Sequence, residues 1–348
     1  MKIRSVLVVA CVLLTGCATN SADTSSSKLF VYNWTDYLDQ SELTRFTQET
    51  GINVVLDVYD SNETLLAKLQ AGGNGYDVIF PSDYMVPQLQ SLGLLKELNT
   101  SELSNAKNIK PEFFDVPWDR ERKYTAPYMY GSTGIACNPI DPECLQIRSW
   151  RDYFTTTSTG VSSIKDQNDV VSAALRAVGV TAENLCTTDK EPYQKALELL
   201  QNFHPKVIDS DGSTERMLNG NTTIQQTWNG EVFRMRPDIP DLIYIYPTEG
   251  LNLWADNIAI PEGANHVDNA KIFINWLLDP KNVAAQSNYT GYDNAIIGAY
   301  EFMDPKVKDD PAIVPPAEFA SLLSPTPRCG PDALELYTQV FTTWTTNQ

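Results

Sequence analysis

The sequence has few of the residues on which catalysis and metal binding most often depend. Its 348 residues include only two histidines, His204 and His266, and no two cysteines have C-x-x-C spacing. This ligand supply argues against a zinc or redox site. The G-x-S-x-G elbow, the phosphate-binding glycine loops and the H-E-x-x-H motif are also absent. Pairs of acids could serve glycoside hydrolysis, but no pattern places a sugar between them, so we expect neither an enzyme nor a cofactor.

Basic residues are scarce relative to acidic ones. The chain has 26 lysines and arginines against 44 aspartates and glutamates, which gives a formal net charge of −18. This is the wrong sign for a nucleic-acid partner, because phosphate backbones bind basic surfaces. Acidity suits a cationic ligand, but it also serves solubility alone, so the charge supports a cationic ligand without deciding for it.

The chain has no apolar run of the roughly 20 residues that a membrane span needs. Its first residues carry Lys2 and Arg4, then an apolar run at 6–14 that stops at Leu-Thr-Gly-Cys, ending in Cys17. This pattern is typical of a secretory signal peptide. Its ending resembles the bacterial lipobox, which implies that residues 1–16 are removed and that Cys17 is lipidated. The alternative is a plain signal peptide in which this cysteine is incidental.

Residues 17–27 are rich in Ser and Thr and have no periodicity, so we expect a flexible tether. The protein is then held by lipid in the bacterial cell envelope, in the periplasm or on the outer face of the membrane. Whether the inner or the outer membrane holds it stays open.

Four cysteines remain after the signal peptide and the lipid are set aside: Cys137, Cys144, Cys186 and Cys329. An exported protein meets an oxidising compartment, so disulfides are expected, and four cysteines allow three pairings. We favour Cys137–Cys144, because the short loop between them contains two prolines and can close on itself. Cys186–Cys329 is then the remaining pair.

The first part of the folded chain alternates between strand and helix patterns. Strands are predicted at 29–32, 53–59 and 76–80, with a helix capped by Ser41 and ended by Gly51, a helix opened by Ser61 at its cap, and a third at 85–92. This order predicts a parallel sheet with helices on its faces. Ligands bind such sheets at the carboxyl ends of the strands, and here those ends carry aromatic and acidic residues at 33–37 and 81–84.

The mixed pattern resumes after a stretch without a helix signal at 124–136, which we interpret as a connection into a second lobe. Helices are predicted at 170–178, 193–203, 268–278 and 335–344, and strands or extended segments near 223–227, 242–246 and 253–261.

Six short motifs occur in a specific order along the chain: VYNWTDY at 31–37, YDSNET at 59–64, YDVIFPS at 76–82, WNG at 228–230, WAD at 254–256 and AIP at 259–261. From residue 28 onward the chain resembles the spermidine/putrescine-binding proteins of polyamine ABC importers. The resemblance implies an α/β, two-lobed periplasmic binding protein of type II, with a mixed sheet flanked by helices in each lobe and the ligand in the cleft between them. Lobe 1 would hold 28–133 plus about 257–295, and lobe 2 would hold 134–256 plus about 296–348.

A polyamine is a thin apolar rod that carries ammonium groups. Each buried ammonium needs a carboxylate, and the methylenes suit flat aromatic walls whose π faces also attract cations. Together with the resemblance, this chemistry predicts the following ligand-binding residues: Trp34, Thr35, Asp36, Tyr37, Ser82, Asp83, Tyr84, Asp166, Asp169, Trp228, Glu231, Trp254, Asp256 and Tyr292.

The resemblance assigns an amine partner to Asp256, two residues after the aromatic of the WAD motif. Asp169 departs from the family pattern Asp-x-x-Glu by one methylene, which leaves the ligand length open. Glu231 is similar to putrescine-type relatives, whereas Trp254 and Tyr84 are similar to the spermidine type, so the choice between these two polyamines also stays open.

Asp83 has two interpretations. It is either a further acid of the cleft or a surface residue that caps the next helix, and we favour the cap.

As a family member the protein would capture its polyamine as a monomer and deliver it to a membrane ABC permease. The alternative is a sensor that reports to a membrane signalling receptor. A binding protein for another cationic solute is a third hypothesis. Iron-binding relatives favour adjacent tyrosines, which are absent here, and sugar and anion binders would not need so many cleft acids.

Overall fold

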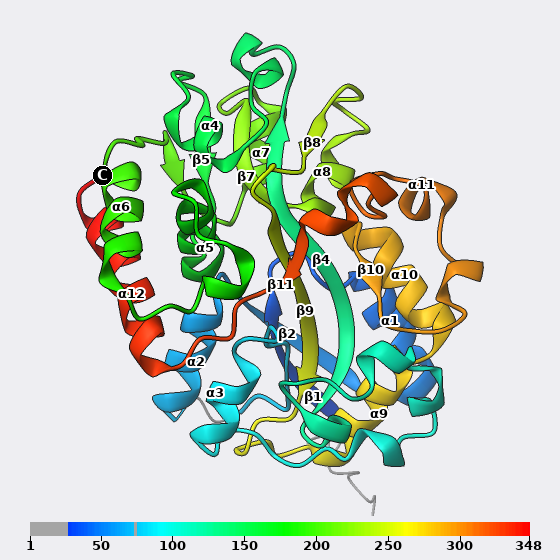
Figure 1. Ribbon diagram of the computed structural model, residues 1–348. Coiled ribbons are helices and arrows are strands. Elements are labelled where there is room, and N and C mark those ends of the chain that lie inside the picture. Colours follow the sequence, from blue (N-terminus) through cyan, green and yellow to red (C-terminus); the bar gives the residue numbers. More distant parts are fainter. Residues whose placement is uncertain (1–26, 73–74) are drawn as a thin grey trace, which may run out of the picture.

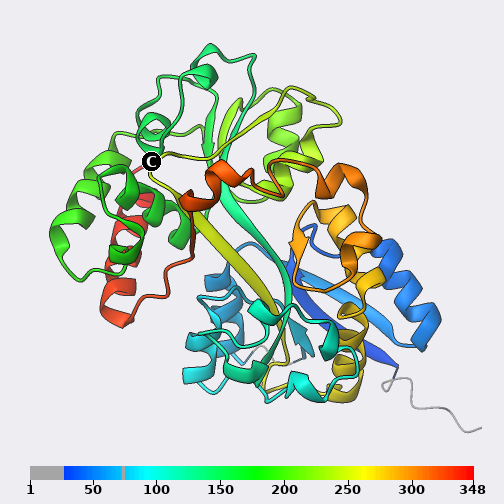
Figure 2. The same ribbon diagram turned by 45° about the vertical axis from the view of Figure 1, so that its right-hand side comes forward.

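The computed structural model describes residues 27–72 and 75–348. The predicted signal peptide, the predicted lipidation site Cys17 and residues 18–26 of the predicted tether lie outside the described residues. Eleven strands in the described part pair into one network, and helices cover it in two lobes, one above the other in Figures 1 and 2. No helix of this part of the chain is long and apolar enough to span a bilayer.

The first lobe is built on β1 (Lys28–Trp34), which lies between β2 (Asn53–Tyr59) and β3 (Val78–Ile79) and runs parallel to both. Parallel neighbours need crossover connections, and α1 (Gln40–Thr50) and α2 (Asn62–Gln70) supply them. The helix α3 (Val86–Ser91) follows β3. The predicted parallel sheet is therefore confirmed, and the carboxyl ends of β1 and β3 bring residues 34–37 and 81–84 to one edge.

The caps of the first two helices test the local predictions. Ser61 caps α2 by accepting a hydrogen bond from the Thr64 N–H at 3.2 Å, which agrees with the prediction that Ser61 and Asn62 open this helix. Gly51 ends α1 with φ of 76°, also as predicted. The prediction that Ser41 caps α1 is wrong, because the Asp39 carboxylate already accepts the Ser41 N–H at 2.8 Å and α1 begins at Gln40.

Two long strands connect the lobes. β4 (Thr125–Cys137) and β9 (Leu251–Ala259) are antiparallel and pair from Thr125 opposite Ala259 to Ser132 opposite Leu253. Beyond that pairing β4 continues into the second lobe, where it pairs with β7 and β8. Figure 1 shows both strands running from one lobe to the other. The stretch interpreted as a connection is thus itself a 13-residue strand of both lobes.

The second lobe has its own sheet. β7 (Ile224–Trp228) and β8 (Ile243–Ile245) flank the end of β4, and β5 (Val161–Ser163) lies between β7 and β6 (Val207–Ile208), parallel to both. Its helices are α4 (Trp150–Thr155), α5 (Gln167–Ala177), α6 (Lys190–Gln201), α7 (Ser213–Leu218), α8 (Asn229–Met235) and α12 (Pro331–Thr346). The last helix packs against α5 and α6.

The returning part of the chain packs mainly with the first lobe. It forms α9 (Val267–Leu277), α10 (Pro280–Thr290), β10 (Asp293–Asn294) and α11 (Pro305–Lys308). Met303, Val307 and Ile313 belong to the hydrophobic cluster of that lobe. Ala312 already belongs to the cluster of the second lobe, so we propose that the last lobe boundary, predicted at about 295, lies after Val307, close to Ala312.

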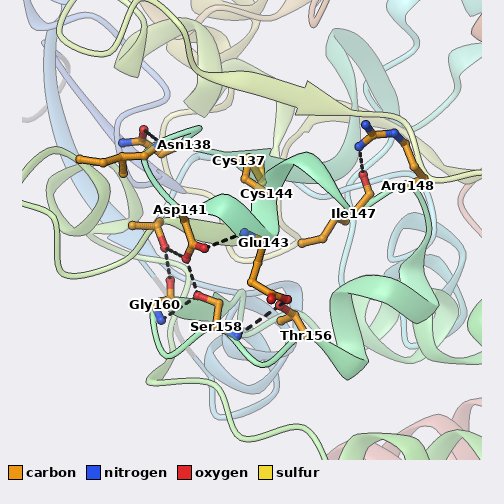
Figure 3. Close-up of a disulfide and its surroundings, with 12 residues drawn as sticks. Cys137, Asn138, Asp141, Glu143, Cys144, Ile147, Arg148, Thr156, Ser158 and Gly160 are labelled. Atoms are coloured by element: carbon orange, nitrogen blue, oxygen red, sulfur yellow. Dashed lines mark hydrogen bonds between the residues drawn. A yellow bond between two sulfur atoms is a disulfide. The ribbon is translucent and has the colours of Figure 1, made fainter.

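Both predicted disulfides are present. Cys137 at the end of β4 is bonded to Cys144, and Figure 3 shows the tight loop between them, which Asp141 closes by accepting hydrogen bonds from the Glu143 N–H and from Ser158. Cys186 is bonded to Cys329. This second bond fastens the segment between β11 (Leu323–Pro325), a strand paired with β9, and α12 to the second lobe.

Candidate functional site

A cavity with about 570 Å³ of empty volume lies between the lobes, where the ends of β1 and β3 face α5 and α8. Of the fourteen predicted ligand-binding residues, thirteen line it. They are Trp34, Thr35, Asp36, Tyr37, Ser82, Tyr84, Asp166, Asp169, Trp228, Glu231, Trp254, Asp256 and Tyr292. That these side chains bind a ligand stays a prediction.

Aromatic rings from both lobes form the walls of the cavity. The rings of Trp34 and Trp228 lie edge to face with centroids 6.0 Å apart, and those of Trp254 and Tyr292 are 5.0 Å apart. The Trp34 indole N–H donates to the carbonyl of Phe80 at 2.9 Å, which fixes the ring at the end of β1. The cavity therefore presents rigid, flat apolar surfaces with π electrons exposed to a ligand.

Two of these rings pack closely against glycines, which have no side chain to clash with them. A Cβ atom at Gly131 of β4 would lie 2.6 Å from Cζ2 of Trp254, and one at Gly230 would lie 2.5 Å from Cε1 of Tyr292. Both distances are too short for any side chain. The Gly230 of the WNG motif is thus needed for the close approach of the aromatic wall to α8.

Asp256 is a buried carboxyl group on the first-lobe side of the cavity. It accepts hydrogen bonds from the Ser82 hydroxyl at 2.6 Å and from the Tyr37 hydroxyl at 2.7 Å. Its side chain is almost fully buried, and this burial raises its pKa to about 6, against the lowering effect of the two hydrogen bonds. A cation placed beside it would stabilise its ionised form.

Asp169 is the corresponding group on the second-lobe side. Its carboxylate accepts hydrogen bonds from Thr133 at 2.6 Å, from Asn252 at 2.9 Å and from the Trp228 indole at 3.2 Å. Burial nevertheless raises its pKa above the ordinary value. The three donors are neutral, so they orient the carboxylate without compensating its charge.

Asp166 lies beside Asp169 at the start of α5. It is the N-cap of that helix and accepts the Asp169 backbone N–H at 2.8 Å. Burial, and then the nearby carboxylates of Asp169 and Glu63, raise the pKa of Asp166 well above its ordinary range. Two acids so close, and so poorly solvated, would gain most from a cationic ligand.

Glu231 differs from the other cavity acids. Its Oε2 accepts from the Ser213 hydroxyl at 2.8 Å and from the Thr214 hydroxyl at 2.6 Å, and its Oε1 accepts from the guanidinium of Arg234. Among the cavity carboxylates that the structure describes, Glu231 is the one that forms an ion pair.

Asp83 is the predicted residue that does not line the cavity. It is 1 % exposed and lies behind Ser82, with its Oδ2 3.6 Å from Nη1 of Arg328. Burial raises its pKa to about 8, and Arg328 acts against that shift. The favoured interpretation as a surface helix cap is wrong, because α3 begins at Val86 after Met85 and has no side-chain cap.

The comparison with protein families decides what kind of protein has this cavity. Residues 43–316 match the family described as bacterial extracellular solute-binding protein. The chain belongs to that family. Solute-binding proteins capture and hand over their ligands rather than convert them, so the absence of catalytic motifs from the sequence agrees with the family.

Relatives of this solute-binding protein confirm the predicted resemblance. The spermidine/putrescine-binding periplasmic protein of Salmonella typhimurium is 32 % identical over 324 residues, 91 % of each chain. The putrescine-binding periplasmic protein PotF of Escherichia coli is 29 % identical over 344 residues, 92 % of each chain. Among solved structures, a putative spermidine/putrescine ABC transporter protein from Listeria monocytogenes has a TM-score of 0.85 at 31 % identity and covers 92 % of this chain and 100 % of its own. The two-lobed α/β fold is thereby confirmed as well.

Two residues that line the cavity of this solute-binding protein were not predicted from the sequence, Arg234 and Thr326. Thr326 follows β11 and reaches the cavity because its backbone N–H donates to the carbonyl of Leu253 at 3.1 Å. No local pattern marks it. The spacing of Glu231 and Arg234, three residues apart on a helix, is a signal for an ion pair that could have been used.

Proposed function

We propose that the protein captures a linear polyamine of the putrescine or spermidine class between its two lobes. The observation that carries this proposal is the state of three buried cavity acids, Asp166, Asp169 and Asp256. Their hydrogen-bond donors are neutral, and none of the three forms an ion pair with a described residue. Burial raises their pKa values, and for Asp169 the charge of Arg176 offsets only part of that rise. A buried carboxylate without a cation is costly, so the cavity is arranged for a ligand that supplies the positive charges.

The aromatic walls restrict the kind of cation. A metal ion needs several oxygen ligands around one point, whereas these acids are distributed over β9 and the start of α5, with indole and phenol rings between them. Methylene chains pack on such rings, and ammonium groups are attracted by their faces. The names of the relatives support the same class of ligand. Capture involves no chemistry: the lobes close on the ligand, and the closed form is the one that the ligand stabilises.

The further steps of the proposal concern the cell. The protein, anchored through lipid on Cys17 in the bacterial envelope, delivers its ligand to a membrane ABC permease. Similarity to a spermidine/putrescine ABC transporter substrate-binding protein from Streptococcus pneumoniae, which is 30 % identical with a TM-score of 0.74, supports an ABC permease as the partner. Deletion of the gene should abolish polyamine uptake by cells, and Cys17→Ala should move the protein from the membrane fraction to the soluble one.

The deciding experiment is calorimetric titration of the chain from Lys28 onward with putrescine, cadaverine, spermidine and spermine. Butylamine, which has one amine, and succinate, which has two carboxylates, are the matched controls. Micromolar or tighter binding of at least one polyamine, with neither control bound, is the expected result. A folded protein that binds none of the four polyamines would contradict the proposal.

A further inference from the structure

Glu231 lies in the cavity with most of its hydrogen-bonding capacity already used. Both of its oxygens accept bonds from protein groups, one from Arg234 and the other from Ser213 and Thr214. Asp256, by comparison, accepts two neutral hydroxyls and no cation. A ligand ammonium at Glu231 would therefore have to share Oε1 with the guanidinium of Arg234 or displace it, and Arg234 is itself a cation.

Arg234 is fixed in place from the other lobe. It lies one turn after Glu231 on α8, and its Nη1 donates to the carbonyl of Thr290, the last residue of α10, at 2.6 Å. The two charged side chains are 19 % and 12 % exposed. The ion pair is thus largely shielded from water. A shielded, charge-assisted pair is stronger than one on an open surface. The guanidinium cannot swing away from the cavity without breaking both bonds.

The cavity therefore contains one fixed positive charge beside its unpaired acids. A ligand ammonium that approached the Glu231 end would meet an acid whose charge is compensated and a cation that repels it. We propose that Arg234 is a specificity-determining residue: by occupying Glu231 it closes this end of the cavity to an additional ammonium group, and leaves the ligand amines to Asp166, Asp169 and Asp256. The inference rests on the proposed function and concerns the number of amines that the same site takes.

The test is the ratio of spermine affinity to putrescine affinity, measured by calorimetry for the wild type and for Arg234→Gln. Spermine has two more amines than putrescine, so it should gain from a freed Glu231. We expect the ratio to rise about tenfold or more, the effect of one hydrogen bond to a charged group. Arg234→Met, which keeps the aliphatic packing, is the second variant and should change the ratio in the same direction. Glu231→Gln/Arg234→Gln should lose the gain, because no carboxylate is then freed.

Arg236→Gln is the matched control. Arg236 lies at the end of the same helix and pairs with Asp310, outside the cavity, so the variant changes the net charge equally without freeing Glu231. Its ratio should equal that of the wild type. An unchanged ratio in folded Arg234→Gln and Arg234→Met, or an equal rise in Arg236→Gln, would overturn the inference while the proposed function stands. A wild type that binds no polyamine would overturn both.

Discussion

The hydroxyl of Tyr37 donates a hydrogen bond to the carboxylate of Asp256 across 2.7 Å, although 219 residues separate them in the sequence. Tyr37 follows β1, and Asp256 lies on the crossing strand β9. The contact joins the first strand of the first lobe to the strand that returns from the second. An acid held at this junction is placed where both lobes reach a ligand.

Replacement of Asp256 by Asn should weaken polyamine binding by about 3–5 kcal/mol, because it removes one partner of a buried ion pair. The amide keeps the size of the side chain and can still accept from Ser82 or Tyr37. Titration calorimetry measures the loss, with Asp268→Asn, an exposed acid of α9, as the control. A loss below about 1 kcal/mol, typical of an exposed pair, would mean that Asp256 holds no ammonium.

Polyamine affinity should rise as the pH rises through about 6. The pKa of Asp256 in the ligand-free protein is raised to about 6 by burial, and the pKa values of Asp166 and Asp169 are also raised. A bound ammonium lowers these pKa values, so binding releases protons, and each released proton changes the affinity about tenfold per pH unit below the free pKa. Calorimetry at pH 5 to 8 in buffers of different ionisation enthalpy counts the protons. Affinity that is independent of pH over this range would contradict the assignment.

The stability of the ligand-free protein should respond to the same pKa with the opposite sign. Because the folded pKa of Asp256 lies above its ordinary value of 3.8, the folded state binds more protons than the unfolded state between about pH 4 and 6. This group therefore stabilises the fold fully below pH 4, and its contribution is lost as the pH rises through 6. Between pH 4 and pH 7 the free energy of unfolding, measured by urea denaturation, should decrease less for Asp256→Asn than for the wild type. An equal loss would mean that other groups account for it.

The π face of Trp254 should matter more than its volume. Trp254→Phe keeps an aromatic face beside Tyr292, whereas Trp254→Leu keeps only apolar bulk. We expect the leucine variant to lose about 1–2 kcal/mol more of binding free energy, the range of a desolvated cation–π contact. Equal losses in the two variants, measured with the same polyamine, would indicate that the wall acts through packing alone.

The sequence predicted the cavity better than it predicted the crossing between the lobes. Trp34 and Ser82 each lie two residues beyond the end of a predicted strand, so the rule for parallel sheets was enough to bring their neighbourhoods together. The long strand β4 was not predicted, because Pro127, Gly131 and Gly134 weaken a strand pattern. It forms because it has pairing partners in both lobes, and its Gly131 is required by the ring of Trp254.

The burial of Asp83 against Arg328 and the contact that holds Arg234 from the other lobe could not be predicted, because each depends on a distant part of the chain. Asp83 faces Arg328, which the bond at Cys329 fastens nearby. Arg234 reaches the carbonyl of Thr290 on another helix. Local patterns identify which side chains are polar but not which distant group will compensate them.

The two disulfides should contribute unequally to stability. Cys186 and Cys329 are 143 residues apart, whereas Cys137 and Cys144 are seven apart. A disulfide lowers the conformational entropy of the unfolded chain, and more so for a longer loop. On this basis the long bridge should add about 5 kcal/mol to the free energy of unfolding and the short one about 2 kcal/mol. Denaturation of the two double Cys→Ser variants in urea should show this order. Unchanged circular dichroism spectra are the sign that the folded states are comparable.

Loss of the Cys186–Cys329 disulfide should also affect ligand binding in the cavity. Cys329 lies three residues after Thr326, which lines the cavity, and next to Arg328, which faces Asp83 behind it. Cys186→Ser/Cys329→Ser should therefore weaken polyamine binding as well as stability, whereas Cys137→Ser/Cys144→Ser, at the far end of β4, should weaken stability alone. Titration at a temperature where both variants are fully folded separates the two effects. Equal affinities of the two variants would mean that β11 holds Thr326 in place without the disulfide.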